Sequence, residues 1–184
     1  LTTDNSGVTL TNANLANANN VYPAGHVIQT SEVITGTTST TVSATNNTFT
    51  PSVVTASITP IYSNSAIAIF ASFAILINDS SGELGATFHF KRTATGIADS
   101  TPDSLKGYSG TGNKHGNIYR NGAQYVTLVD SYSLAWMDSN VSIADTAVTY
   151  QLEVAQYNCS GTVEVGGLGG YNGRFNIWLQ EIKR

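Results

Sequence analysis

Hydrophobic and polar residues alternate with a period of two along most of the chain after residue 25. Residues 85–93 (GATFHFKRT) place Phe88 and Phe90 on one parity, and residues 146–157 (TAVTYQLEVAQY) repeat the alternation. Such alternation predicts β-strands with one buried face. Further strands are expected at 25–34, 35–43, 53–60, 66–77, 124–129, 131–137, 161–167 and 174–182. About nine or ten short strands without a helix predict an all-β protein, an antiparallel β-sandwich of jelly-roll or Greek-key type.

Residues 66–77 form the most hydrophobic run, in which only Ser72 is not apolar. The run is too short for a membrane-spanning helix, which needs about 20 residues. Its many β-branched and aromatic residues favour a strand. We expect the bulky odd positions to fill the sandwich core: Ile67, Ile69, Phe73, Ile75 and Ile77.

The even positions of the same run are apolar as well, so the second face of this strand should not meet water. The Thr-rich segment of the same chain is one candidate cover, and a neighbouring copy of the protein is the other. Homo-oligomers are common, and their interfaces can resemble a core cut in half. We therefore predict a subunit interface that contains Ala66, Ala68, Phe70 and Ala74.

The first two dozen residues differ from the rest of the chain. They are polar, with isolated hydrophobic residues such as Val8 and Leu10, and Pro23 and Gly25 mark a boundary. This composition suits an extended segment. We predict an N-terminal arm at 1–24 and a β-sandwich domain at 25–184.

Residues 94–123 are rich in Gly, Ser and Asn, and we expect a long irregular segment there. Long loops of this kind are often functional, and binding surfaces often combine Tyr with small polar residues. The candidate recognition residues are Tyr108, Lys114, His115, Tyr119 and Arg120. The alternative is a loop that fills space at one end of the sandwich.

The composition and charge of the chain limit the classes of molecule it can be expected to bind. Charged residues make up 11% of the chain and the net charge is −4, whereas soluble domains average about a quarter charged. The eight basic residues are scattered, so nucleic acid is not an expected partner. The single cysteine, Cys159, excludes an intrachain disulfide.

Candidate chemistry is sparse. The three histidines are far apart in sequence, and His89 lies on the polar parity of its strand, which predicts a surface residue. Glu153 likewise alternates outward, onto a solvated sheet face. The glycines at 166–170 lie between strands without a following helix, so they predict a turn rather than a phosphate site.

Two acidic pairs are the remaining candidates for a metal. Asp79 with Glu83, or Asp99 with Asp103, could bind Ca²⁺ in a loop, but neither matches the EF-hand pattern. No catalytic motif is present in the sequence. We expect a non-enzymatic protein with no cofactor and no bound metal.

Several short motifs together resemble virion structural proteins of tailed phages, especially marine and cyanobacterial ones. They are Gly25–Gln29 (GHVIQ), Ser57–Pro60 (SITP), the Ser-rich turn and long apolar strand Ser63–Ile77, Thr149–Gln151 (TYQ) and the closing Trp178–Ile182. Together they extend over residues 24–184, and the segment 94–123 departs most from the pattern.

The resemblance implies a TNF/C1q-like jelly-roll knob on the virion surface, assembled as a homotrimer in a capsid decoration protein or the tip of a head or tail fibre. It implies that the N-terminal arm docks onto other virion proteins, and it supplies no catalytic residue. Such a protein is made in the host cytoplasm and is not inserted into a membrane. The alternative is a lectin-like, receptor-binding module whose 94–123 segment contacts a host surface glycan.

Overall fold

The computed structural model of the 184-residue chain describes residues 22–42, 48–79, 83–100, 116–121, 127–139, 141–168 and 173–184. Every regular element in these ranges is a β-strand. The strands are β1 (Val27–Thr30), β2 (Ile34–Gly36), β3 (Ser39–Val42), β4 (Thr50–Ile58), β5 (Ala66–Asn78), β6 (Glu83–Ala94), β7 (Ile97–Ser100), β8 (Gly116–Asn121), β9 (Thr127–Asp138), β10 (Val148–Gln156), β11 (Thr162–Gly166) and β12 (Phe175–Ile182).

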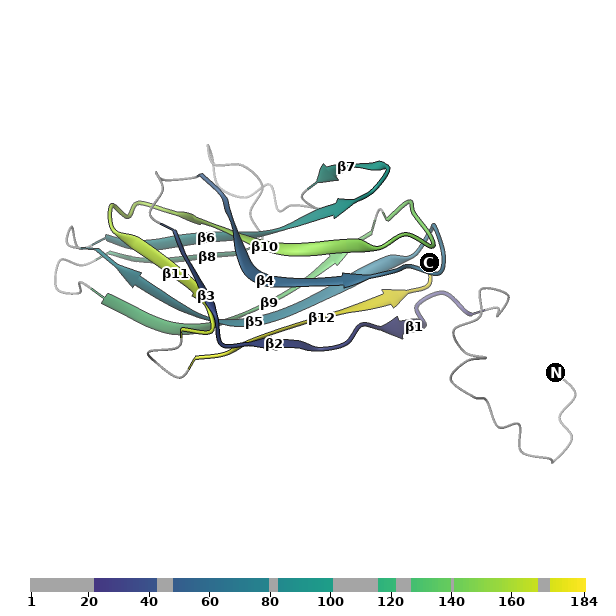
Figure 1. The fold of residues 1–184 in the computed structure, drawn as a ribbon, viewed down its shortest axis with the longest axis horizontal. Coiled ribbons are helices and arrows are strands. Elements are labelled where there is room, and N and C mark those ends of the chain that lie inside the picture. Colours follow the sequence, from purple (N-terminus) through teal and green to yellow (C-terminus); the bar gives the residue numbers. More distant parts are fainter. Residues whose placement is uncertain are drawn as a thin grey trace, which may run out of the picture.

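The strands form two antiparallel sheets that lie over one another (Figure 1). In the seven-stranded sheet, β5 pairs along its whole length with β9 and on its other side with β12 and then β11. The next positions hold β1 and β2 beside β12, and β3 beside β11. The five-stranded sheet has the order β4, β10, β6, and then β8 and β7.

The pairing is nested: early strands pair with late ones. Strands β1 and β2 pair with β12, β4 with β10, β5 with β9, and β6 with β7 and β8. A chain that folds back on itself in this order and distributes successive strands between two sheets is a jelly roll. The predicted fold class is confirmed.

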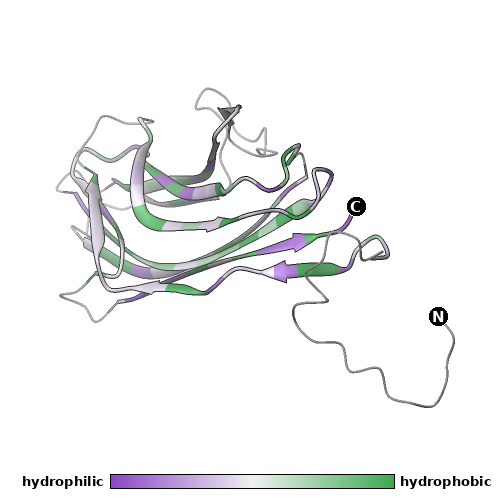
Figure 2. Ribbon diagram, turned by 45° about the vertical axis from the view of Figure 1, so that its right-hand side comes forward, coloured by the Kyte–Doolittle hydropathy of each residue, from purple (hydrophilic) through white to green (hydrophobic). Residues whose placement is uncertain are grey.

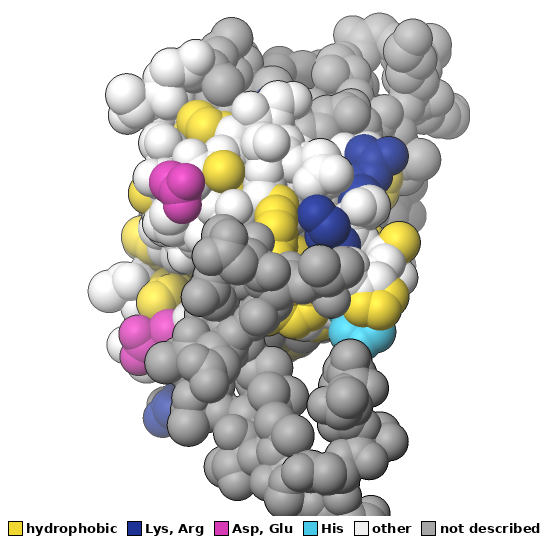
Figure 3. All heavy atoms as spheres, turned by 90° about the vertical axis from the view of Figure 1, so that its right-hand side faces the viewer, with side chains coloured by type: hydrophobic (Ala, Val, Ile, Leu, Met, Phe, Trp, Pro, Cys, Tyr) yellow, Lys and Arg dark blue, Asp and Glu magenta, His cyan; other side chains and the backbone are white. Residues whose placement is uncertain are grey.

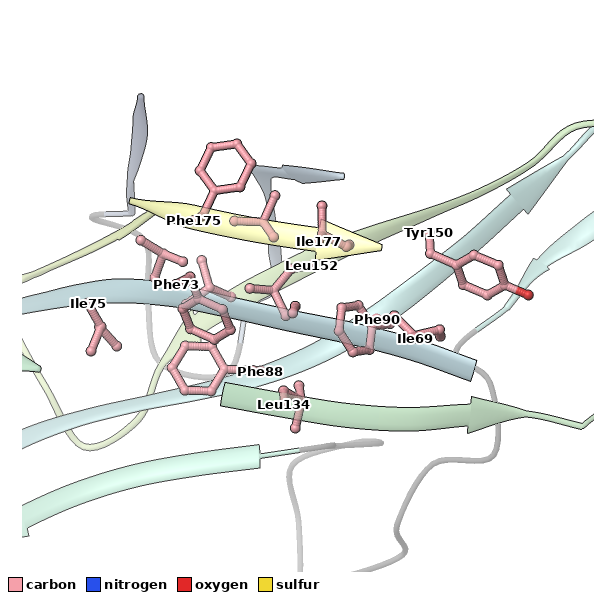
Figure 4. Packing of buried hydrophobic residues seen from close by; sticks show 14 of the residues in the cluster. Ile69, Phe73, Ile75, Phe88, Phe90, Leu134, Tyr150, Leu152, Phe175 and Ile177 are labelled. Carbon is pink, nitrogen blue, oxygen red and sulfur yellow. The ribbon is translucent and has the colours of Figure 1, made fainter. Parts of the chain in front are cut away.

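The hydrophobic core lies between the sheets, and β5 contributes one side of it. Its odd residues Ile67, Ile69, Phe73, Ile75 and Ile77 are each at most 1% exposed, as predicted. Figure 4 shows Phe73 of β5 beside Phe88 of β6, and the two rings meet edge to face at 5.2 Å. Hydrophobic stretches interleave with polar ones along the strands (Figure 2).

Three strand predictions need correction. The segment 94–123 is not irregular throughout, because β7 and β8 within it pair with β6. Residues 127–138 form one strand rather than two around Asp130, because that carboxylate is exposed at a sheet edge and interrupts nothing. The strand expected at 25–34 is divided into β1 and β2, and between them Ser31 exchanges hydrogen bonds with Leu179.

Several sequence predictions lie outside the described residues. They are the arm before Tyr22 and the recognition residues Tyr108, Lys114 and His115. In the part of the chain that the structure describes, there is no helix long and apolar enough to cross a membrane.

Candidate interaction surface

The outer face of the seven-stranded sheet carries a band of apolar side chains. Strand register places Phe70 between Trp178 and Ala135, and Ala68 between Gln180 and Met137. The rings of Phe70 and Trp178 stack at 5.1 Å with an angle of 12° between their planes. We call the following residues the apolar band: Ala66, Ala68, Phe70, Ala135, Met137 and Trp178.

Four residues of the apolar band line a shallow hollow. The hollow has a volume of about 380 Å³ and is lined by Ala68, Phe70, Ala135, Trp136 and Met137. Met137 is 43% exposed beside it, and Phe70 is half-buried. None of the lining residues is ionisable, so the hollow offers only apolar contact. Contiguous exposed apolar surface of this kind marks interaction sites on soluble proteins.

The chain itself covers the other end of the same face. Leu168, which follows β11, is 1% exposed and packs on Ala74 and Leu76. The backbone reaches this position through Gly166 (φ 127°), and Gly167 passes so close to Thr37 that a Cβ atom would lie 2.1 Å from its carbonyl carbon. Ala74 therefore lies under its own chain, whereas Ala66, Ala68 and Phe70 belong to the apolar band.

Two alanines of the apolar band are well packed, whereas Ala135 is exposed. Ala66 and Ala68 are each 5% exposed, and the residues paired with them have larger side chains: Ile182 beside Ala66, and Gln180 and Met137 beside Ala68. The Thr-rich segment, the other cover considered for this face, forms β3 beside β11 at the edge of the sheet. Phe70, Ala135, Met137 and Trp178 thus carry the accessible apolar surface of the band.

Charged side chains are few and separate on the described surface. Figure 3 shows the end of the molecule that carries the C-terminus, where acidic and basic side chains lie in separate spots among uncharged ones. Glu164, on the outer face beyond the apolar band, is hydrogen-bonded to Ser39. The surface therefore offers hydroxyl and apolar contacts more than a charged field.

Two residues on the outer face of the five-stranded sheet are buried, although the sequence predicts them at the surface. His89 and Glu153, expected at the surface, are 7% and 8% exposed. Nε2 of His89 lies 2.7 Å from Oε2 of Glu153, and the His89 ring stacks on Phe49 at 3.8 Å. Alternation places both residues on the outer side of the sheet, as predicted, but Phe49 shields the pair from solvent.

Glu181 is a buried acid that the sequence analysis did not single out. Its side chain has no exposed surface and accepts hydrogen bonds from the backbone N–H groups of Ile61 and Tyr62, from Ser65 Oγ at 2.6 Å and from Gln29 Nε2 at 2.7 Å. This carboxylate ties the turn before β5 to the end of β12. The sequence does contain a signal for this, because Glu181 has the same parity as the core residues Ile177 and Leu179 and therefore falls on the buried face of its strand. A buried acid needs hydrogen-bond donors.

A second buried polar network lies at one end of the core. Oδ2 of Asp138 accepts hydrogen bonds from Arg92 Nη1 at 2.7 Å and from Tyr150 Oη at 2.8 Å. Burial raises the pKa of Tyr150, and the Asp138 carboxylate raises it further. Figure 4 shows the Tyr150 hydroxyl pointing away from the other labelled side chains. The network joins β6, β9 and β10 and is structural.

Two of the candidate recognition residues fall in β8. Tyr119 is 40% exposed, meets the Tyr157 ring edge to face at 5.6 Å and donates a 3.3 Å hydrogen bond to Glu83. Arg120 pairs through its backbone with Leu84. The two residues are neighbours on a strand rather than parts of a loose loop.

Of the acidic metal candidates, Asp79 and Glu83 each bond to a different part of the chain, and Asp103 lies outside the described residues. Asp79 accepts hydrogen bonds from the backbone N–H and the hydroxyl of Ser160 at 2.6 and 3.0 Å, so it fastens the turn before β11. Glu83 accepts a hydrogen bond from the Tyr119 hydroxyl. Within the described ranges, no three His, Cys, Asp or Glu side chains lie close enough to hold a metal ion. Burial raises the pKa of the Cys159 thiol, which makes it a poor nucleophile.

Comparisons with known proteins place the chain in no family. No protein-family model and no curated protein matches its sequence. Among solved structures, one described as "Structure of infectious bursal disease virus Gx strain" is similar to 85% of this chain, with 11% identity and a TM-score of 0.33. The match spans 37% of that structure's chain. At this TM-score the likeness carries no argument about family or function.

Proposed function

We propose that the chain is a non-enzymatic structural protein of a virion, a jelly-roll knob on the particle surface that assembles with copies of itself. The apolar band on the seven-stranded sheet carries this proposal. A flat, uncharged, partly exposed sheet face fits another protein surface better than a small polar substrate. The phage motifs at Gly25–Gln29 and Ser57–Pro60 support the assignment to a tailed phage.

In the finer form of the proposal, the knob is a homotrimer that decorates or stabilises the capsid or forms a fibre tip. Each copy buries Phe70, Met137 and Trp178 against a neighbour. Aromatic side chains and Met are enriched in the buried centres of interfaces and charged residues are depleted there, which matches the composition of the band. The segment 1–24 serves in this proposal as the contact with other virion proteins.

A second candidate function is recognition of a host surface glycan. The observation that favours it is the exposed ring of Tyr119, held in place by Tyr157 and Glu83. A fixed aromatic ring supplies contact area at low entropic cost. Loss of cell binding in Tyr119→Ala, with unchanged binding in Tyr157→Phe, supports this role. If Tyr119→Ala binds cells as well as Tyr157→Phe does, Tyr119 is not the contact.

Imaging of the intact particle by electron cryo-microscopy tests the main proposal. The expected result is a jelly-roll density with three-fold symmetry on the capsid or at a fibre tip, with segment 1–24 directed to the shell or stalk. Absence of the chain from purified particles, measured by mass spectrometry of their proteins, contradicts the proposal.

A further inference from the structure

Strand β9 is a long, continuous sheet edge whose protection against pairing is limited to one residue, Asp130. Within the described part of the chain it pairs on one side only, with β5, over twelve consecutive residue pairs and without a register shift. Natural sheets blunt such edges with short strands, Pro, bulges and charged side chains, including ones that point inward. Strand β9 contains no Pro, Lys or Arg. Its one exposed charge is Asp130, which lies on the core side of the strand and accepts a 2.8 Å hydrogen bond from the backbone N–H of Ser131.

The other described edges are short, interrupted or divided, whereas β9 is continuous. Strands β1, β2 and β3 share one edge in pieces of three or four residues. Strand β4 contains Pro51, and its pairing with β10 is interrupted by a register shift. Strands β7 and β8 divide the remaining edge between them. The contrast sets β9 apart as an edge built to receive a strand.

We infer that β9 pairs antiparallel with β9 of a second copy about a two-fold axis through Ser133. In this register Val129 lies opposite Met137 and Ser131 opposite Ala135, all on the outer face of the sheet. Val129 and Met137 are 44% and 43% exposed in the single chain, so each hydrophobic side chain covers the other. Two-fold pairs are the commonest arrangement of identical subunits.

Charge is compatible with this register. Asp130 lies opposite Trp136 of the second copy, and the two Asp130 residues are six residues apart along the strands, about 20 Å. That distance exceeds the screening length of about 10 Å in ordinary buffer. A register shifted to an axis through Tyr132 would leave Met137 opposite Thr127 and Val129 opposite Ala135, which loses the match between the two exposed hydrophobic side chains.

This edge contact uses the backbone of β9, which the face contact of the proposed function does not use, and the two contacts share one side chain, Met137. Backbone hydrogen-bonding groups of β9 point sideways in the plane of the sheet, whereas the side chains of the apolar band point out of it. One copy can therefore use both contacts. The inference stands on β9 alone and does not depend on a role in a virion.

Disulfide trapping tests the register. Ser133→Cys places two thiols opposite each other at the axis, where Cα atoms lie about 4.5–5.5 Å apart, within disulfide range. Ser131→Cys is the matched control, because its copies are four residues apart along the strands, about 13 Å. The native Cys159 is 2% exposed, which keeps the background low.

The expected result in a glutathione redox buffer is a dimer of Ser133→Cys at least ten times more abundant than that of Ser131→Cys, and its loss when urea is present during oxidation. Equal cross-linking of the two variants, or none, overturns the inference. Repeating the measurement with Phe70→Arg added separates the two contacts. The Ser133 cross-link is expected to persist even if the face contact is lost or never existed.

Discussion

Glu181 shows how one buried charge can fix a connection between distant parts of the chain. It accepts hydrogen bonds from two backbone N–H groups of the turn before β5, from Ser65 and from Gln29. An isolated buried carboxylate is costly, and hydrogen bonds to a charged group repay that cost. The carboxylate therefore acts as the acceptor around which residues 61–65 are ordered.

Glu181→Gln tests this role. The amide replaces an acceptor oxygen with a donor that faces other donors, so we expect the free energy of unfolding to fall by about 3 kcal/mol. Urea denaturation measures the change. Glu164→Gln is the control, because Glu164 is half-buried and bonds one hydroxyl, Ser39. A loss in Glu181→Gln no larger than in Glu164→Gln would contradict the role.

Tyr150 makes stability depend on alkaline pH. Its pKa is raised in the folded chain, first by burial and then by Asp138, whereas the unfolded chain titrates near pH 10. Above that pH the unfolded state loses a proton that the folded state keeps, so stability falls as pH rises, by about 1.4 kcal/mol per pH unit for this residue.

Unfolding of the wild type and of Tyr150→Phe at pH 8 and pH 11 measures the effect. We expect Tyr150→Phe to be less stable at pH 8 by about 1 kcal/mol, because the hydrogen bond to Asp138 is gone. Between the two pH values it should lose less stability than the wild type. Equal losses in both proteins would show that Tyr150 does not cause the pH dependence.

At the scale of the element, β5 gives one face to the core and the other to the outside. The odd positions from Ile67 to Ile77 are buried between the sheets. On the even side, Ala74 and Leu76 lie under Leu168 and Phe70 lies in the apolar band. A strand that is apolar on both faces therefore meets a different cover at each end of its outer face.

Phe73→Ala and Ser72→Ala separate the two faces. Phe73 is 1% exposed and contacts Phe88 and Tyr132, so its truncation should cost about 3–5 kcal/mol. Ser72 is half-buried on the outer face, and its hydroxyl accepts a 3.4 Å hydrogen bond from the Ser133 hydroxyl. Its truncation should lower the free energy of unfolding by less than about 1 kcal/mol. Similar losses in urea denaturation would mean that the faces are wrongly assigned.

Alternation in the sequence was enough to predict which side of β5 fills the core, because strand geometry alone decides it. Alternation also placed His89 and Glu153 on the outer side of their sheet, yet both are buried. The alternation of residues along a strand does not predict which other residues cover the outer face. Here the cover is the Phe49 ring, which comes from a distant part of the chain. Leu168 over Ala74 was unpredictable for the same reason.

At the scale of the whole molecule, the nested pairing of strands is what makes the fold a jelly roll. The sequence indicated strands and their spacing, but the pairs β4 with β10 and β5 with β9 join residues far apart in the chain. Local patterns carry no information about such partners. The candidate interface was partly predictable, since Ala66, Ala68 and Phe70 were identified, whereas Met137 and Trp178 joined them only through the strand register.

Assembly is the property that links the surface to the proposed function. Phe70, Met137 and Trp178 lie at an uncharged patch, and a charge placed there would have to be desolvated in any contact between copies. Phe70→Arg should therefore weaken self-association by at least tenfold and leave the fold intact, because Phe70 is half-buried and lies outside the core. Asn176→Arg, on the same face beyond the hollow, is the control.

Sedimentation equilibrium of the wild-type protein over a range of concentrations measures whether the apolar band joins copies of the molecule. With a chain mass of 19.4 kDa, we expect a species of three chains or a multiple of three, and a shift to lower mass for Phe70→Arg. A wild-type protein that remains a single 19.4 kDa chain at every concentration would contradict the claim that its apolar face joins copies of the molecule.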